Sequence, residues 1–260
     1  MPFRDVGPLR LYQFESMVQA GVVHAIFTRR GGTSPAPWRS LNVGGTVGDV
    51  RERVVENRRR CFAAVGRAPE SIHDVWQVHS ADVVQARAPR GAASPVQADG
   101  LICGDPSVTL FMRFADCVPV LLFDPTRRVV GMVHAGWLGT ARRAVSACVQ
   151  AMVRSYGCRP EDLLAGIGPS IGPDHYPVGD EVIEQVRVAF GSQAEAYLVP
   201  KDGRVHFDLW SANWGLLEDE GVRSVEVSGI CTACHPLDWF SHRGEHGRTG
   251  RFGGLIGLEG

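Results

Sequence analysis

Residues 115–137 read ADCVPVLLFDPTRRVVGMVHAGW, which combines two apolar runs with a cysteine and a histidine. Two apolar runs, 118–123 and 129–133, are separated by a short polar turn, so they predict buried strands that pair antiparallel. Cys117 comes directly before the first run and His134 directly after the second. Because strand ends are where a rigid sheet presents reactive groups to a cleft, both residues are candidates for function.

A second histidine, His79, ends another short strand-like run at 75–78. Two imidazoles and one thiolate are a common catalytic metal set, because three protein ligands leave a fourth position for water or substrate. The three residues are too widely spaced for a zinc finger, so only a fold that brings strand ends together could make them a site. Asp116 is a candidate acceptor that would orient an imidazole. The candidate catalytic residues are therefore His79, Asp116, Cys117 and His134.

The composition indicates a globular protein without a strongly charged face. Of the 260 residues, 44% are hydrophobic and 21% are charged, and the formal net charge is −1. Nucleic-acid binding is disfavoured because it needs a basic face. No apolar run is long enough for a membrane span, and the first residues lack a signal-peptide pattern. The odd number of cysteines, seven, then predicts free thiols and a cytoplasmic protein.

The remaining patterns predict an α+β fold in a single domain over residues 1–260. Strand-like runs cluster between residues 101 and 133, where short turns favour antiparallel pairing, and helices gather later in the chain. This segregation favours α+β over a doubly wound parallel sheet. The expected helices lie at 49–65, 140–156, 180–190 and 208–217. The expected strands lie at 22–27, 75–79, 101–103, 108–114, 118–123, 129–133, 163–167, 222–227 and 255–258.

The run CTACH at 231–235 has the C-x-x-C-H spacing of covalent haem attachment. Such attachment needs an exported chain and an axial ligand, and no methionine follows Met152. A structural metal site would need a second, matching cysteine pair, which the sequence lacks. We therefore predict a turn in which Cys231 and Cys234 are reduced thiols, without haem.

Two glycine-rich runs are candidates for binding an anion. In GIGPSIGP at 166–173, backbone amides could approach a ligand closely, although two prolines remove donors. The run RGEHGRTGR at 243–251 combines glycines with three arginines, which suits phosphate. A tight turn and a solvated loop are the respective structural alternatives.

Taken together, these segments resemble the bacterial laccase-like, or multicopper polyphenol oxidase, family. The matching runs occur in family order over nearly the whole chain, and DCVPV and HAGW are the most specific of them. They are 27–32 (FTRRGG), 40–44 (SLNVG), 56–58 (ENR), 77–79 (QVH), 98–101 (ADGL), 115–120 (ADCVPV), 133–137 (VHAGW), 166–172 (GIGPSIG), 176–179 (YPVG), 240–243 (FSHR) and 249–251 (TGR).

The resemblance implies a fold in which β-sheets are sandwiched between helix layers. It also implies a metal site at His79, Cys117 and His134, filled by Zn²⁺ or alternatively by copper. The implied activity is that of a purine nucleoside phosphorylase that acts on adenosine, inosine or S-methyl-5′-thioadenosine, with adenosine deaminase activity. Its partners would be small molecules, a nucleoside and phosphate, while the oligomeric state stays open. The candidate phosphate and sugar contacts are Arg29, Asn42, Arg243 and Arg251.

The chain departs from the family pattern at three positions. Leu138 follows the HAGW run where many relatives have arginine, so one anion contact is lost. His175 lies in the glycine-rich turn where cysteine is frequent, and His242 replaces the usual tyrosine of the FSHR run. We expect the two histidines to change the polarity of the pocket.

The candidate metal set favours hydrolytic or transfer chemistry over oxygen reduction. Multicopper oxidases hold their ions through His-x-His pairs, and no two of the nine histidines are separated by a single residue. An open zinc position would instead ionise water near neutral pH or polarise a purine base.

Two alternatives come from other functional classes. One is a metal-free cysteine hydrolase acting on cell-wall precursor amides, with Cys117 as nucleophile and His134 or His79 as base. The other is an electron-transfer module built on the C-x-x-C-H run.

Overall fold

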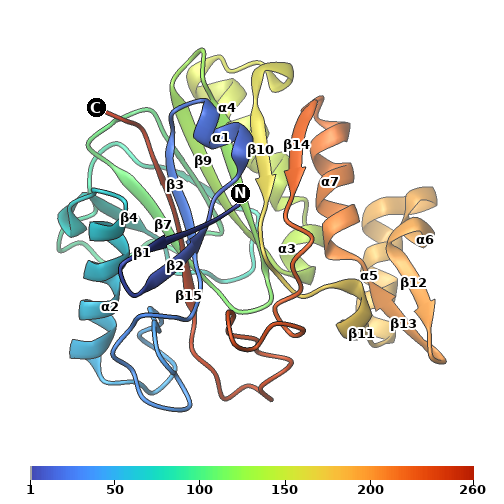
Figure 1. Ribbon diagram of the computed structural model, residues 1–260. Coiled ribbons are helices and arrows are strands. Elements are labelled where there is room, and N and C mark those ends of the chain that lie inside the picture. Colours follow the sequence, from blue (N-terminus) through green and yellow to red (C-terminus); the bar gives the residue numbers. More distant parts are fainter. Residues whose placement is uncertain (1) are drawn as a thin grey trace.

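The fold is built on two six-stranded sheets (Figure 1). The computed structural model describes residues 2–260. The first sheet has the order β1-β2-β3-β15-β7-β4, and its neighbouring strands are antiparallel except for β4 and β7, which are parallel. Its strands are β1 (Phe3–Val6), β2 (Leu9–Tyr12), β3 (Val23–Phe27), β4 (Ile72–Asp74), β7 (Thr109–Phe114) and β15 (Phe252–Gly257).

The second sheet has the order β14-β10-β8-β9-β6-β5. Its three central pairs are antiparallel, whereas the outer pairs β14–β10 and β6–β5 are parallel. Its strands are β5 (Val83–Gln85), β6 (Gly100–Cys103), β8 (Val118–Asp124), β9 (Val129–Ala135), β10 (Leu164–Ile167) and β14 (Ser224–Val227). The antiparallel pairing expected around residues 118–133 is confirmed for β8 and β9.

Alternating side chains fill the space between the two sheets. Ile26 and Met112 of the first sheet belong to the same buried cluster as Leu121 and Met132 of the second. Because successive side chains of a strand point to opposite faces, the neighbouring Phe27 belongs to a different cluster on the outer face of its sheet. Full burial of one such side chain stabilises the fold by about 1.5–3 kcal/mol, so this interface is a main source of stability.

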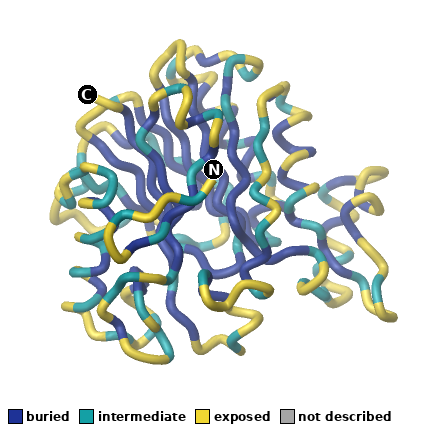
Figure 2. Tube along the Cα trace, viewed as in Figure 1, coloured by how far each residue is buried: buried dark blue, intermediate teal, exposed yellow. Residues whose placement is uncertain are grey.

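Helices cover the outer faces of both sheets. On the first sheet, α2 (Arg51–Ala64) buries Cys61 and Phe62. On the second, α4 (Ala144–Tyr156) buries Cys148 and α7 (Leu209–Asp219) buries Leu216. Figure 1 shows α2 and α7 on opposite sides of the molecule, and Figure 2 shows the strands between them as its buried centre. The expected arrangement of sheets between helix layers is confirmed. No helix in the described part of the chain has the length and apolar character that crossing a membrane requires.

A small three-stranded sheet of order β11-β13-β12 lies beyond α7 at the right of Figure 1. Its strands are β11 (Pro177–Val178), β12 (Leu198–Lys201) and β13 (Arg204–Phe207), and α5 (Asp180–Phe190) and α6 (Ala194–Tyr197) connect them. Helix α5 has the bounds that its sequence pattern predicts. The short strands were not predicted, because two to four residues are too few to show an alternating pattern.

The chain changes sheets at residues 115–117. Strand β7 ends at Phe114 in the first sheet, and β8 begins at Val118 in the second. Asp116 lies in this crossover with a positive φ of 82°, a backbone conformation that is uncommon outside glycine. The two apolar runs on either side of Cys117 therefore belong to different sheets and do not pair with each other.

Two sequence predictions of secondary structure were wrong near the candidate site. The strand expected at 75–79 is a loop, because β4 already ends at Asp74 and His79 has a φ of 60°. The helix expected at 140–156 is two helices, α3 (Trp137–Ala141) and α4, since the left-handed Arg143 separates them. The helix expected at 208–217 is α7, and the carboxylate of Asp208 caps it by accepting hydrogen bonds from the amides of its first turn.

Candidate metal centre

The structure brings His79, Cys117 and His134 together, and we call these three residues the inner group. Their ligand atoms all lie within 4.8 Å of one another, and Cys117 Sγ is 3.9 Å from His79 Nε2. Ligand atoms around tetrahedral zinc lie roughly 3.3–3.6 Å apart, as bond lengths of about 2.0–2.3 Å require. The inner group therefore needs only small side-chain rotations to surround an ion.

Asp99 orients both histidines of the inner group. Its Oδ1 accepts a hydrogen bond from His134 Nδ1 at 2.8 Å, which leaves Nε2 of that ring free for a ligand. Its Oδ2 accepts hydrogen bonds from the amides of Val78 and Ser80, the residues on either side of His79. Burial by itself would raise the pKa of Asp99, but these hydrogen bonds outweigh it and hold the pKa below the usual value. Asp99 is therefore a carboxylate at neutral pH.

Asp116 has a different role from the one expected of it. We expected its carboxylate to orient an imidazole, but that contact belongs to Asp99. Asp116 instead accepts hydrogen bonds of 2.6 Å from Thr232 Oγ1 and from the backbone amide of Arg243. It therefore ties the C-terminal loops to the crossover that carries Cys117.

Gly136 provides the space that the inner group occupies. A Cβ atom at this position would lie 2.7 Å from Cys117 Sγ and 3.2 Å from His79 Cδ2, so no larger residue fits without displacing them. The ring of Phe114 packs against His134, with 5.5 Å between the ring centroids. Gly136 therefore packs closely against Cys117 and His79, and the ring of Phe114 packs against His134.

Of the four expected substrate contacts, Arg251 and Arg243 lie beside the inner group. Burial lowers the pKa of Arg251, while the nearby charges of Cys117 and Asp116 act in the opposite direction, and the guanidinium stays cationic. Arg243 is exposed, and its guanidinium stacks over the ring of Tyr176 at 5.0 Å. Arg251 therefore presents positive charge near Cys117, whereas the guanidinium of Arg243 also donates to the carbonyl of Pro177 at 3.0 Å.

The other two expected contacts hold loops in place. Asn42 is fully buried, and its side chain bonds to Asp49, to Gly44 and to the backbone amide of Arg251. Arg29 donates to the carbonyls of Arg39, Pro236 and Trp239 and pairs with Glu245 at 3.1 Å. Asn42 thus acts on the position of Arg251, whereas Arg29 joins two loops through Nε and Nη1.

Three residues near the inner group were not predicted from the sequence. Asp99 is part of the family-like run ADGL, but only the fold shows that it faces His134. Arg142, one helical turn after Leu138, donates a hydrogen bond to the backbone oxygen of His79 at 3.2 Å, so a guanidinium lies beside the site despite the departure at 138. Burial, and then the charge of Cys117, raises the pKa of Tyr176, which places this phenol in the same environment.

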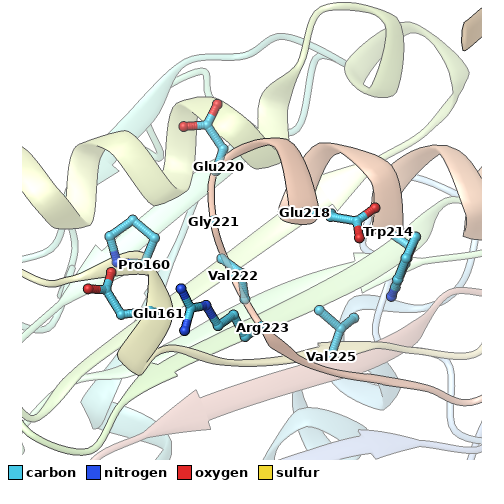
Figure 3. Close-up of a pocket in the computed structure, with 9 residues that line it drawn as sticks. All are labelled: Pro160, Glu161, Trp214, Glu218, Glu220, Gly221, Val222, Arg223 and Val225. Atoms are coloured by element: carbon cyan, nitrogen blue, oxygen red, sulfur yellow. The ribbon is translucent and has the colours of Figure 1, made fainter.

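Two cavities lie away from the inner group. A cavity of about 510 Å³ is lined by residues 160–161, by Trp214 and Glu218 of α7, and by Arg223 in the segment that follows this helix (Figure 3). A second, of about 550 Å³, lies between Arg29 and Leu237. No histidine or cysteine lines either cavity. We assign the candidate site by the chemistry of the inner group, because a metal centre acts through its ligands rather than through cavity volume.

Comparison with known proteins identifies the family. Residues 23–259 match the family described as multi-copper polyphenol oxidoreductase laccase. The chain belongs to this family. Within residues 2–260, however, only two groups of three metal-ligating side chains lie close enough together to hold an ion.

Relatives of known name and structure match over nearly their full length. A Deinococcus radiodurans protein named purine nucleoside phosphorylase is 40% identical over 237 residues, which cover 91% of this chain and 89% of that protein. The purine nucleoside phosphorylase YlmD of Bacillus subtilis is 34% identical, and the match covers 92% of this chain and 89% of that protein. The crystal structure of YlmD from Geobacillus stearothermophilus superposes with a TM-score of 0.93 at 33% identity, over 100% of this chain and 99% of that one.

Proposed function

We propose that the chain is a metal-dependent purine nucleoside phosphorylase that acts on adenosine, inosine or S-methyl-5′-thioadenosine and also deaminates adenosine. In phosphorolysis, a phosphate oxygen bonds to C1′ of the sugar as the bond from C1′ to the purine breaks, which yields the sugar 1-phosphate and a free base. In deamination, water replaces the 6-amino group and ammonia leaves. The observation that carries this proposal is the convergence of the inner group beside Arg251, and the relatives' names support the substrate class.

The inner group suits Zn²⁺, with copper as the alternative ion. A thiolate and two imidazoles match the ligands of catalytic zinc, and the carboxylate of Asp99 behind His134 is the usual support for such a ligand. When bound there, the ion supplies a Lewis acid next to the substrate. The seven free cysteines agree with a reducing, cytoplasmic location, where a metal-binding thiolate survives.

The surrounding residues have separate tasks in this proposal. Arg251 and Arg243 bind the phosphate dianion, because charge-assisted hydrogen bonds from guanidinium groups are the strongest that a side chain offers. Asn42 holds the backbone of Arg251 in register. Asp116 is a positioning residue, since both of its oxygens already accept hydrogen bonds within the protein. Tyr176 is protonated at neutral pH and can donate its hydroxyl hydrogen to the sugar or the base.

Product analysis tests the proposal. Zinc-loaded protein is incubated with adenosine and phosphate, and the products are separated by chromatography. We expect adenine and ribose 1-phosphate together with a smaller amount of inosine. Without phosphate, no adenine should form, because phosphorolysis consumes phosphate, whereas inosine should still form. If zinc-loaded protein forms neither a free base nor inosine, the proposal is wrong.

The cysteine hydrolase remains the second candidate because Cys117 Sγ lies 3.9 Å from His79 Nε2. A chelator separates the two functions. The phosphorylase should lose activity on chelation and regain it with zinc, whereas a cysteine nucleophile should cleave its amide substrate in the metal-free protein. Loss of activity in Cys117→Ala would not distinguish them, since both depend on the sulfur.

A further inference from the structure

A second cluster of metal-ligating side chains lies outside the inner group. It consists of His175, Cys231 and Cys234, which we call the outer group, and its ligand atoms also lie within 4.8 Å of one another. His175 Nδ1 is 3.4 Å from Cys234 Sγ and 3.9 Å from Cys231 Sγ. Both cysteines are free thiols. The missing partner for the C-x-x-C pair is therefore a histidine from a distant part of the sequence.

The backbone holds the two parts of the outer group together. Residues 170 and 231 form a parallel β-bridge, and the amide of Thr232 donates a hydrogen bond to the carbonyl of Ser170 at 2.9 Å. His175 ends the short helix η3 (Pro173–His175), which begins directly after Gly172. The approach of His175 to the cysteines thus follows from paired backbone rather than from the chance orientation of an exposed side chain.

The surroundings of Cys231 resemble those of a metal-bound thiolate. The amide of Gly172 donates a hydrogen bond to Cys231 Sγ at 3.2 Å, and such contacts to a ligand sulfur favour its charged form. A Cβ atom at position 172 would lie 3.1 Å from Cys231 Cβ and 3.4 Å from its Sγ, so glycine allows this close approach. His235, the last residue of the C-x-x-C-H run, turns away and donates to the carbonyl of Cys231 through Nδ1 at 2.9 Å.

We propose that His175, Cys231 and Cys234 bind a second Zn²⁺ ion. Two thiolates three residues apart with one imidazole are typical zinc ligands, and soft sulfur ligands select against Mg²⁺ and Ca²⁺. The two thiolate charges balance the charge of the ion, and water takes the fourth position. The ion joins the loop around His175 to the 231–234 loop.

The outer zinc ion acts on the inner group through Thr232. This residue lies between the two outer cysteines, and its hydroxyl donates the 2.6 Å hydrogen bond to Asp116, next to Cys117. An ion that fixes the 231–234 loop therefore also fixes Asp116, which accepts this hydrogen bond and lies in the crossover. Zinc content at the outer site is measured without the reaction of the inner group, so the proposal stands or falls separately from the proposed function.

Zinc stoichiometry tests the outer site. Protein kept reduced with a phosphine is loaded with Zn²⁺, desalted and measured by mass spectrometry of the metal. We expect about two ions per wild-type chain and about one in each of Cys117→Ala and Cys234→Ser, since three-ligand zinc sites fail when one ligand is lost. His175→Gln changes only an exposed side chain, so it gives the same test without risk to the fold. Cys158→Ala, a cysteine in neither group, is the matched control and should keep both ions.

Cobalt gives a second readout that does not depend on activity. In Cys117→Ala loaded with Co²⁺, sulfur-to-cobalt charge-transfer absorption should persist, because both outer thiolates remain, and adding Cys234→Ser should abolish it. The proposal is overturned if Cys117→Ala binds no metal, if Cys234→Ser and His175→Gln keep as much zinc as the wild type, or if Cys231 and Cys234 form a disulfide that zinc does not prevent.

Discussion

The inner and outer groups use the same kinds of ligand in opposite proportions. The inner group has one cysteine and two histidines beside the crossover between sheets, where His79 is exposed and His134 is only 5% exposed. The outer group has two cysteines and one histidine on surface loops, where His175 and Cys234 are exposed. Each group places a cysteine against a glycine, Gly136 or Gly172, that leaves room for the sulfur.

The difference between the groups lies in what supports the ligands. Asp99 supports the inner histidines with a full carboxylate, which strengthens a histidine as a metal ligand. A backbone amide supports the outer sulfur, which suits an ion that holds loops together. The buried carboxylate of Asp99 is therefore the feature that separates the inner group from the outer one.

The largest expected effect is a loss of catalytic activity when a ligand of the inner group is removed. Cys117→Ala should lower phosphorolysis and deamination by roughly a thousandfold, because a Lewis acid contributes several kcal/mol and each 1.4 kcal/mol is about tenfold in rate. Steady-state kinetics on zinc-loaded protein measure this loss, with Cys158→Ala as control. Activity within tenfold of the wild type would remove the inner group from the reaction.

Asp99→Asn should weaken zinc binding at the inner group by about 10–100-fold, the usual effect of losing a carboxylate behind a histidine ligand. The amide keeps the size of the side chain, so the fold is retained. Competition with a chromophoric chelator, performed in the Cys234→Ser background to remove the outer ion, measures the affinity. An unchanged affinity would mean that Asp99 only holds the backbone around His79.

The lowered pKa of Asp99 predicts that the stability of the protein depends on pH. The pKa of Asp99 is lower in the folded protein than in the unfolded chain, so its contribution to stability is present above the ordinary carboxyl pKa. It is lost as pH falls through the lowered folded-state pKa. Denaturant titrations of metal-free protein should therefore show a loss of stability in acid that is smaller in Asp99→Asn. If the unfolding free energy of the two proteins falls equally in acid, Asp99 is not the group responsible for the loss.

The two glycines give a matched pair of substitutions. Gly136→Ala should reduce the free energy of unfolding by about 2–3 kcal/mol and weaken inner zinc binding, because its Cβ would lie 2.7 Å from Cys117 Sγ. Gly172→Ala should cost about 1 kcal/mol or less, since its nearest contact is 3.0 Å, to the ring of Trp210. Urea unfolding measures both. Equal losses would show that the inner group is no more tightly confined than the outer one.

The smallest expected effect concerns the link between the groups. Thr232→Val keeps the shape of the side chain but removes the hydrogen bond to Asp116, which should cost about 1–2 kcal/mol of unfolding free energy. Thr232→Ser keeps the hydroxyl and should restore most of this stability. If the serine variant is as unstable as the valine variant, the methyl group rather than the hydrogen bond matters here.

Much of the candidate site could be predicted from the sequence, because its signals are local. The apolar runs on either side of residues 124–127 predict β8 and β9, and the ligand chemistry of His79, Cys117 and His134 suggests a metal before any contact is known. Helix α5 and the Asp208 cap are likewise encoded by nearby residues, since helix periodicity and capping act within a few positions.

Only the tertiary structure decided which distant residues meet. The sequence places Asp116 beside Cys117, yet the carboxylate that reaches His134 is Asp99, because antiparallel pairing sets β6 next to β9. The crossover that separates β7 from β8 is equally invisible locally, since both strands read as apolar runs. The outer group shows the same limit: a C-x-x-C pair is legible in the sequence, but its histidine partner comes from a loop that a single β-bridge brings alongside.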